Sequence, residues 1–191
     1  MANSKLIVVE GPQGAGKTTI TDFLRNSLKY TNLYRLSGTR DSSPTGLDKS
    51  IKMYTDLLDY IESLQNLDIN LVFDRTFFTE EIYCRLGFKE YSFTEVYDKL
   101  LERFSKFDFE IYFVTLYLSE EGLYQRRLER EGKAVTQYAK FSKESSLVQQ
   151  EAYLKMADEI MEKYPNINVI KLDNSRDFEV VKEDLRKIIN Y

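Results

Sequence analysis

A chain of 191 residues, 42% of them hydrophobic, is long enough for one compact domain, and we expect a single domain over residues 1–191. The net charge of −4 leaves no basic excess for a nucleic-acid backbone, and a single cysteine with no histidine excludes an internal disulfide and the commonest general base. No apolar run is long enough for a signal segment or a membrane span, so we expect a cytoplasmic protein without a nucleic-acid or membrane partner.

The first predicted strand, residues 6–9, leads directly into a glycine-rich loop. The loop matches G-x(4)-G-K-[ST], the pattern of a phosphate-binding P-loop, and an apolar-periodic helix follows it to about residue 29. Lys17 would reach the β- and γ-phosphates of ATP, and Thr18 would offer its hydroxyl to Mg²⁺. The predicted phosphate-binding residues are Gly11, Pro12, Gln13, Gly14, Ala15, Gly16, Lys17, Thr18 and Thr19.

Further strand-like runs alternate with helix-like segments, which predicts an α/β fold with a parallel sheet. A polar loop at residues 37–46 follows the second run and should lie near the carboxyl ends of the strands, where ligands bind in open α/β sheets. The later strands are predicted at residues 33–36, 69–73, 111–118 and 167–172, and amphipathic helices at residues 51–64, 96–104 and 153–164.

The third predicted strand ends in Asp74, Arg75 and Thr76. An apolar strand that ends in Asp is the Walker B pattern, so Asp74 is a second candidate ligand for Mg²⁺. Motor and transporter ATPases commonly have a glutamate at the next position to activate water, whereas Arg75 cannot accept a proton and binds anions instead. The pair therefore favours a site for a second phosphate. A capping Asp beside a surface Arg is the alternative.

A basic segment follows the fourth predicted strand. Residues 122–133 place Arg126 and Arg130 on one helical face, and the stretch 134–146 is polar. We expect a mobile lid over about residues 126–146 that brings both arginines to the transferred phosphoryl group and excludes water. A solvent-facing helix is the alternative, because glutamates lie among the arginines.

These residues resemble the thymidylate kinase and deoxynucleoside kinase branch of P-loop kinases, with thymidylate kinases nearest. The resemblance covers nearly the whole chain. It implies a P-loop NTPase fold with a five-stranded parallel sheet flanked by helices, an ATP donor with Mg²⁺, a deoxynucleoside monophosphate acceptor and often a homodimer. The matching segments, in the family's order and spacing, are Val9-Glu10-Gly11, Asp74-Arg75, Gly122-Leu123 leading to Arg126 and Arg130, and Tyr153-Leu154.

The resemblance also implies roles for single residues. Arg75 would hold the acceptor phosphate, Arg35 would match the arginine that opens the family's acceptor loop, and Met53 or Tyr54 would lie beside the base. Gln13 stands where thymidylate kinases usually have Asp and is a further candidate for the acceptor site.

The acceptor itself remains open between a monophosphate and a nucleoside. Deoxynucleoside kinases share the Glu10-Gly11 pair, and in them the carboxylate that matches Glu10 takes the proton of the 5′-hydroxyl. A monophosphate is already anionic and needs no such base. Departures from the thymidylate kinase pattern at Gln13, Leu57 and Thr76 leave the base open as well.

We therefore predict transfer of the γ-phosphoryl group of ATP to a deoxynucleoside monophosphate, dTMP or a related pyrimidine nucleotide. The alternatives are a deoxynucleoside kinase and a nucleotide-binding protein without transfer activity.

Overall fold

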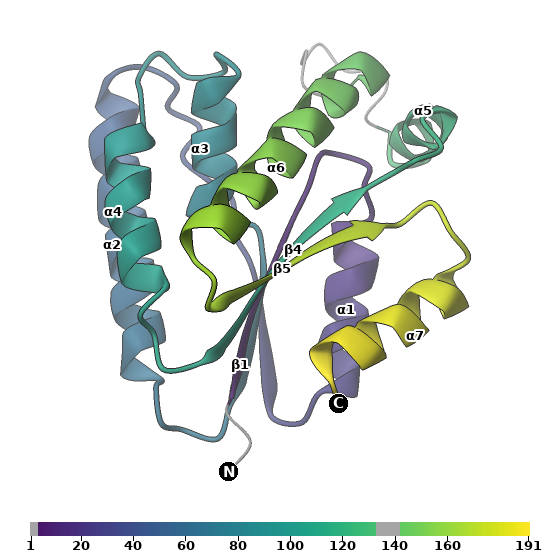
Figure 1. The fold of residues 1–191 in the computed structure, drawn as a ribbon. Coiled ribbons are helices and arrows are strands. Elements are labelled where there is room, and N and C mark those ends of the chain that lie inside the picture. Colours follow the sequence, from purple (N-terminus) through teal and green to yellow (C-terminus); the bar gives the residue numbers. More distant parts are fainter. Residues whose placement is uncertain (1–3, 133–141) are drawn as a thin grey trace.

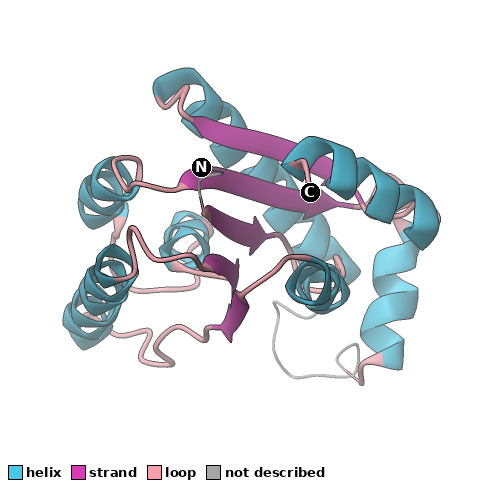
Figure 2. Cartoon of the chain, turned by 90° about the horizontal axis from the view of Figure 1, so that it is seen from below, coloured by secondary structure: helices cyan, strands magenta, loops and turns pink. Residues whose placement is uncertain are grey.

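The structure is a computed structural model that describes residues 4–132 and 142–191. Those residues form one five-stranded parallel sheet with helices on both sides (Figure 1), and a view turned by 90° shows the strands as a twisted layer between the helices (Figure 2). The strands are β1 (Lys5–Glu10), β2 (Thr31–Arg35), β3 (Asn70–Asp74), β4 (Glu110–Tyr117) and β5 (Ile167–Asp173). The helices are α1 (Lys17–Ser27), α2 (Thr45–Ser63), α3 (Phe77–Arg85), α4 (Thr94–Phe104), α5 (Gly122–Arg130), α6 (Lys143–Lys163) and α7 (Phe178–Ile189).

The strand order is β2-β3-β1-β4-β5, which puts β1 at the centre of the sheet. Successive side chains of a strand point to opposite faces, and a central strand of a parallel sheet meets helices on both. In β1, Leu6 and Val8 belong to one buried cluster and Ile7 and Val9 to the other. All four are completely buried, which explains why this segment is a continuous apolar run.

Different helices cover the two faces of the sheet. Helices α2, α3, α4 and α6 cover one face with an aromatic cluster in which Phe78 packs against Phe77, Phe104 and Phe113. Helices α1 and α7 cover the other face with mostly aliphatic side chains. Figure 1 shows α2, α3 and α4 together on one side and α1 with α7 on the other.

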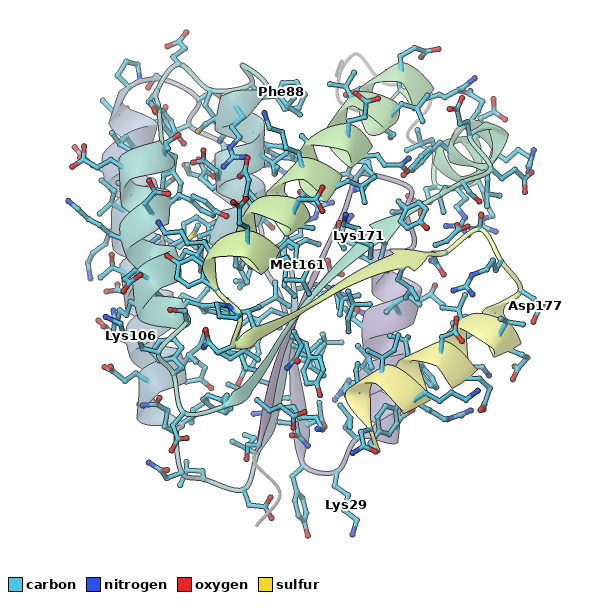
Figure 3. The ribbon with its side chains drawn as sticks, viewed as in Figure 1. Lys29, Phe88, Lys106, Met161, Lys171 and Asp177 are labelled. Carbon is cyan, nitrogen blue, oxygen red and sulfur yellow. The ribbon has the colours of Figure 1, made fainter. Side chains whose placement is uncertain are left out.

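The carboxyl ends of β1, β2 and β3 meet at one edge of the sheet. Asp74 at the end of β3 aligns with Arg35 on one side and with Val9 on the other. Because the P-loop follows β1 directly, this register brings the P-loop, Arg35 and the Asp74-Arg75 pair together. Lys29, between α1 and β2, marks the opposite end of the sheet at the bottom of Figure 3.

The five predicted strands are confirmed, each to within two residues. The three predicted amphipathic helices are present as α2, α4 and α6, but α2 and α6 begin earlier, at Thr45 and Lys143. Neither α3 nor α7 is among the predicted elements. Helix α3 is buried from Phe77 to Ile82, so it lacks the one-sided apolar stripe of a surface helix. Within the described ranges, no helix combines the length and apolar character needed to cross a membrane.

The first turn of α2 depends on a glycine. A Cβ atom added to Gly46 would lie 1.9 Å from the backbone oxygen of Asp41, and backbone cannot move aside as a flexible side chain can. We expect Gly46→Ala to lower the free energy of unfolding by about 2 kcal/mol or more, measured by urea denaturation. Gly122→Ala is the matched control, because it also lies in a first helical turn but meets only the Arg126 side chain, at 3.5 Å. Equal stability of the two variants would contradict this account.

Candidate active site

A cavity of about 450 Å³ opens at the carboxyl edge of the sheet. It is bounded by the P-loop, the ends of β2 and β3, helix α5 and the segment that joins β5 to α7. Its lining residues are Gln13, Gly14, Gly16, Lys17, Thr18, Thr19, Arg35, Leu36, Asp74, Arg75, Leu123, Arg127, Arg130, Glu131, Asn174, Arg176 and Phe178.

The P-loop has the backbone that its sequence predicts. Gly14 and Gly16 have positive φ angles of 85° and 94°, which L-residues with side chains rarely adopt. Gly16 also has no room for a side chain, since a Cβ atom there would lie 2.4 Å from Nδ2 of Asn174. It directly precedes α1, and no side chain caps that helix, so its positive end is suited to an anion. Of the nine predicted P-loop residues, Gly11, Pro12 and Ala15 are buried behind the cavity lining.

Lys17 is held over the P-loop. Its Nζ donates to the carbonyl oxygens of Gly11 and Pro12, at 2.9 Å each, and only 6% of the residue is exposed. The ammonium group therefore lies within the loop whose glycines face the cavity. Thr18 and Thr19 are exposed residues of the same lining.

The Mg²⁺ ion that the resemblance implies needs oxygen ligands beside the phosphates. The Thr18 hydroxyl and the Asp74 carboxylate both belong to the cavity lining. Groups of three or more His, Cys, Asp or Glu that could hold a metal are absent from the described residues. Mg²⁺ commonly takes one or two protein oxygens and completes its shell with phosphate oxygens and water. The donor set of Thr18 and Asp74 fits that mode.

Arg35 lies between two acidic side chains. Its guanidinium contacts Asp22 at 2.6 Å and lies 3.6 Å from Oδ2 of Asp74. It also donates to the backbone oxygen of Thr18, at 3.4 Å. Arg35, which the resemblance assigns to the acceptor, therefore lines the cavity beside Asp74 and Thr18, the candidate metal ligands.

Arg75 combines an unusual backbone with an available side chain. Its φ angle is 72°, and this left-handed conformation costs a residue other than glycine about 1 kcal/mol. The half-buried guanidinium lines the cavity and makes no hydrogen bond or ion pair within 4 Å to any residue that the structure describes. A cation held in this way is available to bind an anion from the cavity.

Glu10 is completely buried and does not line the cavity. Its Oε1 accepts from the backbone N–H of Thr76 at 2.8 Å and from the Thr76 hydroxyl at 3.2 Å, and its Oε2 accepts from the Thr79 hydroxyl at 2.5 Å. Burial raises the pKa of Glu10 to about 7, although these hydrogen bonds and the charges of Lys17 and Arg75 act in the opposite direction. Both carboxylate oxygens therefore accept hydrogen bonds from residues outside the cavity lining.

Of the two predicted lid arginines, the structure brings Arg130 but not Arg126 to the cavity lining. Arg126 is exposed, forms an ion pair with Glu120 and is not part of the cavity lining. Arg127 lines the cavity beside Arg130 and donates to the backbone oxygens of Gly14, at 3.2 Å, and Asn174, at 2.9 Å. The i, i+4 spacing puts Arg126 and Arg130 on one side of α5, but it does not tell which residues on that side reach the cavity.

The residues expected beside the acceptor base lie outside the cavity lining. Tyr54 is 2% exposed and packs edge-to-face against Phe77 and Phe93 in the aromatic cluster, and Met53 packs against that cluster. Gln13 does line the cavity, where its Nε2 lies 3.4 Å from the Tyr83 hydroxyl.

Sequence reasoning missed three lining residues that follow β5: Asn174 and Arg176 in the connection to α7, and Phe178 as the first residue of α7. Asn174 is buried, and its Nδ2 donates to the backbone oxygen of Ala15 at 2.8 Å, which ties this segment to the P-loop. Their position after the fifth predicted strand could have identified them, because ligands bind at the edge of the sheet where parallel strands end.

The predicted lid at about residues 126–146 is only partly described. Residues 133–141 lie outside the described residues. On one side α5 extends to Arg130, and on the other α6 begins at Lys143, so the expected polar stretch ends in a helix. The Ser146 hydroxyl donates to the backbone oxygen of Gln13 at 2.8 Å, which places the start of α6 against the P-loop.

Comparisons with known proteins reveal similarity in structure. No protein-family model matches the chain. No curated protein matches it either. A thymidylate kinase from Candida albicans has a TM-score of 0.67 at 18% identity, over 100% of this chain and 92% of that one. The YorR protein from Bacillus subtilis, in complex with phosphorylated GDP, has a TM-score of 0.66 at 18% identity, over 97% and 95%.

A deoxyadenosine kinase from M. mycoides, with the products dCMP and dCDP bound, has a TM-score of 0.59 at 17% identity. The match covers 97% of this chain and 98% of that one. At these identities the similarity shows a shared fold, so the predicted α/β class with a five-stranded parallel sheet is confirmed.

The raised pKa of Glu10 predicts a pH dependence of stability. The folded-state pKa of about 7 lies above the value of about 4.3 for an unfolded glutamate, so folding favours the protonated form. The associated stability is fully present below about pH 4.3 and is lost as the pH rises through 7. Between pH 4.5 and 8, we expect wild type to lose on the order of 3 kcal/mol of unfolding free energy relative to Glu10→Gln. Urea denaturation at several pH values measures this loss, and parallel pH profiles would contradict the prediction.

Proposed function

We propose that the chain is an ATP-dependent nucleoside monophosphate kinase. The observation that carries the proposal is the Arg75 guanidinium, which lies at the P-loop cavity without a hydrogen-bond or ion-pair partner among the described residues. A transferase that joins two phosphorylated substrates needs one site for the donor phosphates and a second cation for the acceptor phosphate. The P-loop and Arg75 fit these two requirements at one edge of the sheet.

On the donor side, the P-loop would hold the β- and γ-phosphates of ATP. The N–H groups at the start of α1 and the Lys17 ammonium supply positive charge there, and Thr18 with Asp74 would hold Mg²⁺. When bound, Mg²⁺ neutralises charge on the phosphate oxygens. The ring of Phe178 and the guanidinium of Arg176, which line the cavity after β5, would pack against the donor base.

On the acceptor side, Arg75 would bind the phosphate of the monophosphate and orient it toward the γ-phosphoryl group. Arg130 would lie over the transferred group from α5, while Arg127 fixes α5 to the P-loop through Gly14. Catalysis would then consist of positioning and charge neutralisation, without a protein group that removes a proton.

The engagement of Glu10 supports a monophosphate rather than a nucleoside as the acceptor. A nucleoside 5′-hydroxyl requires a base, and the carboxylate predicted for that role is completely buried and accepts hydrogen bonds from Thr76 and Thr79. A monophosphate requires only a cation. We propose a deoxynucleoside monophosphate as the acceptor class, with dTMP as the first nucleotide to test.

Replacement of Arg75 tests the acceptor site. Arg75→Ala should raise KM for dTMP at least tenfold and lower kcat, because charge-assisted hydrogen bonds to the acceptor phosphate are lost. The Kd of ATP, measured by calorimetry without acceptor, should stay within about twofold of wild type. Arg126→Ala is the matched control, because it removes an exposed arginine outside the cavity lining. An equal loss of ATP and dTMP binding in Arg75→Ala would contradict the proposed role.

Replacement of Lys17 tests the donor site. Lys17→Ala should lower kcat by about a hundredfold or more, because the charge that faces the β- and γ-phosphates is removed. Lys17 is not a member of either apolar cluster, so the far-ultraviolet circular dichroism spectrum should stay unchanged. Wild-type turnover in this variant would show that the P-loop is not the donor site.

A further inference from the structure

We propose that Glu10 is a positioning residue for Arg75, whose carboxylate holds the backbone turn that presents the guanidinium to an anionic acceptor. The inference rests on the proposed function, since it concerns how the acceptor cation of that site is held. It gives a role to a buried carboxylate that phosphoryl transfer to a monophosphate does not otherwise need.

The turn at Arg75 is held on both sides by the end of β1. The N–H of Arg75 donates to the Val9 carbonyl at 3.2 Å, and the N–H of Thr76 donates to Oε1 of Glu10 at 2.8 Å. These N–H groups belong to the two peptide planes that flank the Cα atom of Arg75. Since peptide groups are planar, fixing both planes fixes φ and ψ of Arg75.

The backbone conformation that these hydrogen bonds fix at Arg75 is one that arginine does not favour. With φ at 72°, Arg75 lies in the left-handed region, and a residue with a side chain persists there only when its surroundings hold it. Return to a negative φ would rotate the Cα–Cβ bond and move the guanidinium away from its present place in the cavity lining. The hydrogen bond from Thr76 to Glu10 opposes that return.

The second oxygen of the Glu10 carboxylate is also held by a hydrogen bond. Oε2 accepts from the Thr79 hydroxyl at 2.5 Å, and that hydroxyl lies 2.9 Å from the Tyr153 hydroxyl of α6. Glu10, Thr79 and Tyr153 are 0%, 7% and 1% exposed, so water does not compete strongly for these contacts. The carboxylate is therefore held by the start of α3, which Thr79 in turn connects to the middle of α6.

Nearby positive charges partly offset the cost of burying the Glu10 carboxylate. The cations that act on its carboxylate are Lys17 and Arg75, so one buried anion lies close to the cations proposed for both substrates. It also lies at the start of α3, where the helix dipole favours negative charge. A neutral amide of the same shape would keep the packing and lose these attractions.

A double-mutant cycle tests whether Glu10 acts through Arg75. Glu10→Gln should raise KM for dTMP about tenfold or more, because a small displacement of an orienting group has large effects on transfer. The Kd of ATP should change less than about twofold. In an Arg75→Ala background, Glu10→Gln should change KM for dTMP less than about twofold, because the group that it positions is already absent.

Glu81→Gln is the matched control. Glu81 is also completely buried and lies on α3, but it accepts from Arg85 and Thr94 rather than from the turn at Arg75. It should lower Tm without a change in KM for dTMP. If Glu81→Gln raises KM as much as Glu10→Gln does, or if the effects of Glu10→Gln and Arg75→Ala multiply, Glu10 is a general structural residue and the inference is overturned.

A second pair of variants decides the matter if Glu10→Gln does not fold. Thr79→Val removes the hydroxyl that holds Oε2 and keeps the side-chain shape, while Thr79→Ser keeps the hydroxyl. KM for dTMP should rise in Thr79→Val and stay near wild type in Thr79→Ser, and equal KM values in the two would overturn the inference.

Failure of the inference can be told from failure of the proposed function. If wild type phosphorylates no monophosphate, both are overturned. If KM for dTMP depends on Arg75 but not on Glu10 or Thr79, only this inference is overturned.

Discussion

The register between β1 and β3 is the constraint on which the candidate site depends. Parallel pairing aligns Val9 with Asp74, so the residues that follow each strand emerge side by side at the carboxyl edge. On β1 that continuation is the P-loop, and on β3 it is Arg75 with the start of α3. A shift by one residue would turn the buried side chains of either strand to the opposite face, so the packing of both apolar clusters also fixes the geometry of the site.

The site gathers positive charge at the expense of local stability. Arg75 is half-buried and adopts a left-handed conformation, and its guanidinium lacks a hydrogen-bonding partner among the described residues. Each of these features has a cost in the unliganded protein. A phosphate that binds there would supply the missing hydrogen bonds and the opposite charge. Glu10 connects this cost to the core, because it joins the end of β1 to α3 and, through Thr79, to α6.

The sequence predicted the features that depend on neighbouring residues. The strands, the glycine conformations of the P-loop and the place of Asp74 at a strand end all follow from local patterns. Helix α3 was not predicted, because it is buried on most sides and has no one-sided apolar stripe. The hydrogen bonds of Glu10 could not be predicted from the sequence, because its partners Thr76 and Thr79 lie 66 and 69 residues away. Spacing alone assigned Arg126 to the site, whereas Arg127 and Arg130 line the cavity. The family resemblance put Tyr54 beside the base, although its ring belongs to the core.

The central claim is that this protein transfers the γ-phosphoryl group of ATP to a nucleoside monophosphate. The most direct measurement incubates the purified protein with γ-³²P-labelled ATP, Mg²⁺ and, in separate reactions, each common deoxynucleoside and deoxynucleoside monophosphate, and separates the products by chromatography. The account predicts that label enters the β-phosphate of a deoxynucleoside diphosphate and that no deoxynucleoside is labelled. Label in a deoxynucleoside 5′-monophosphate, or in inorganic phosphate alone, would contradict it.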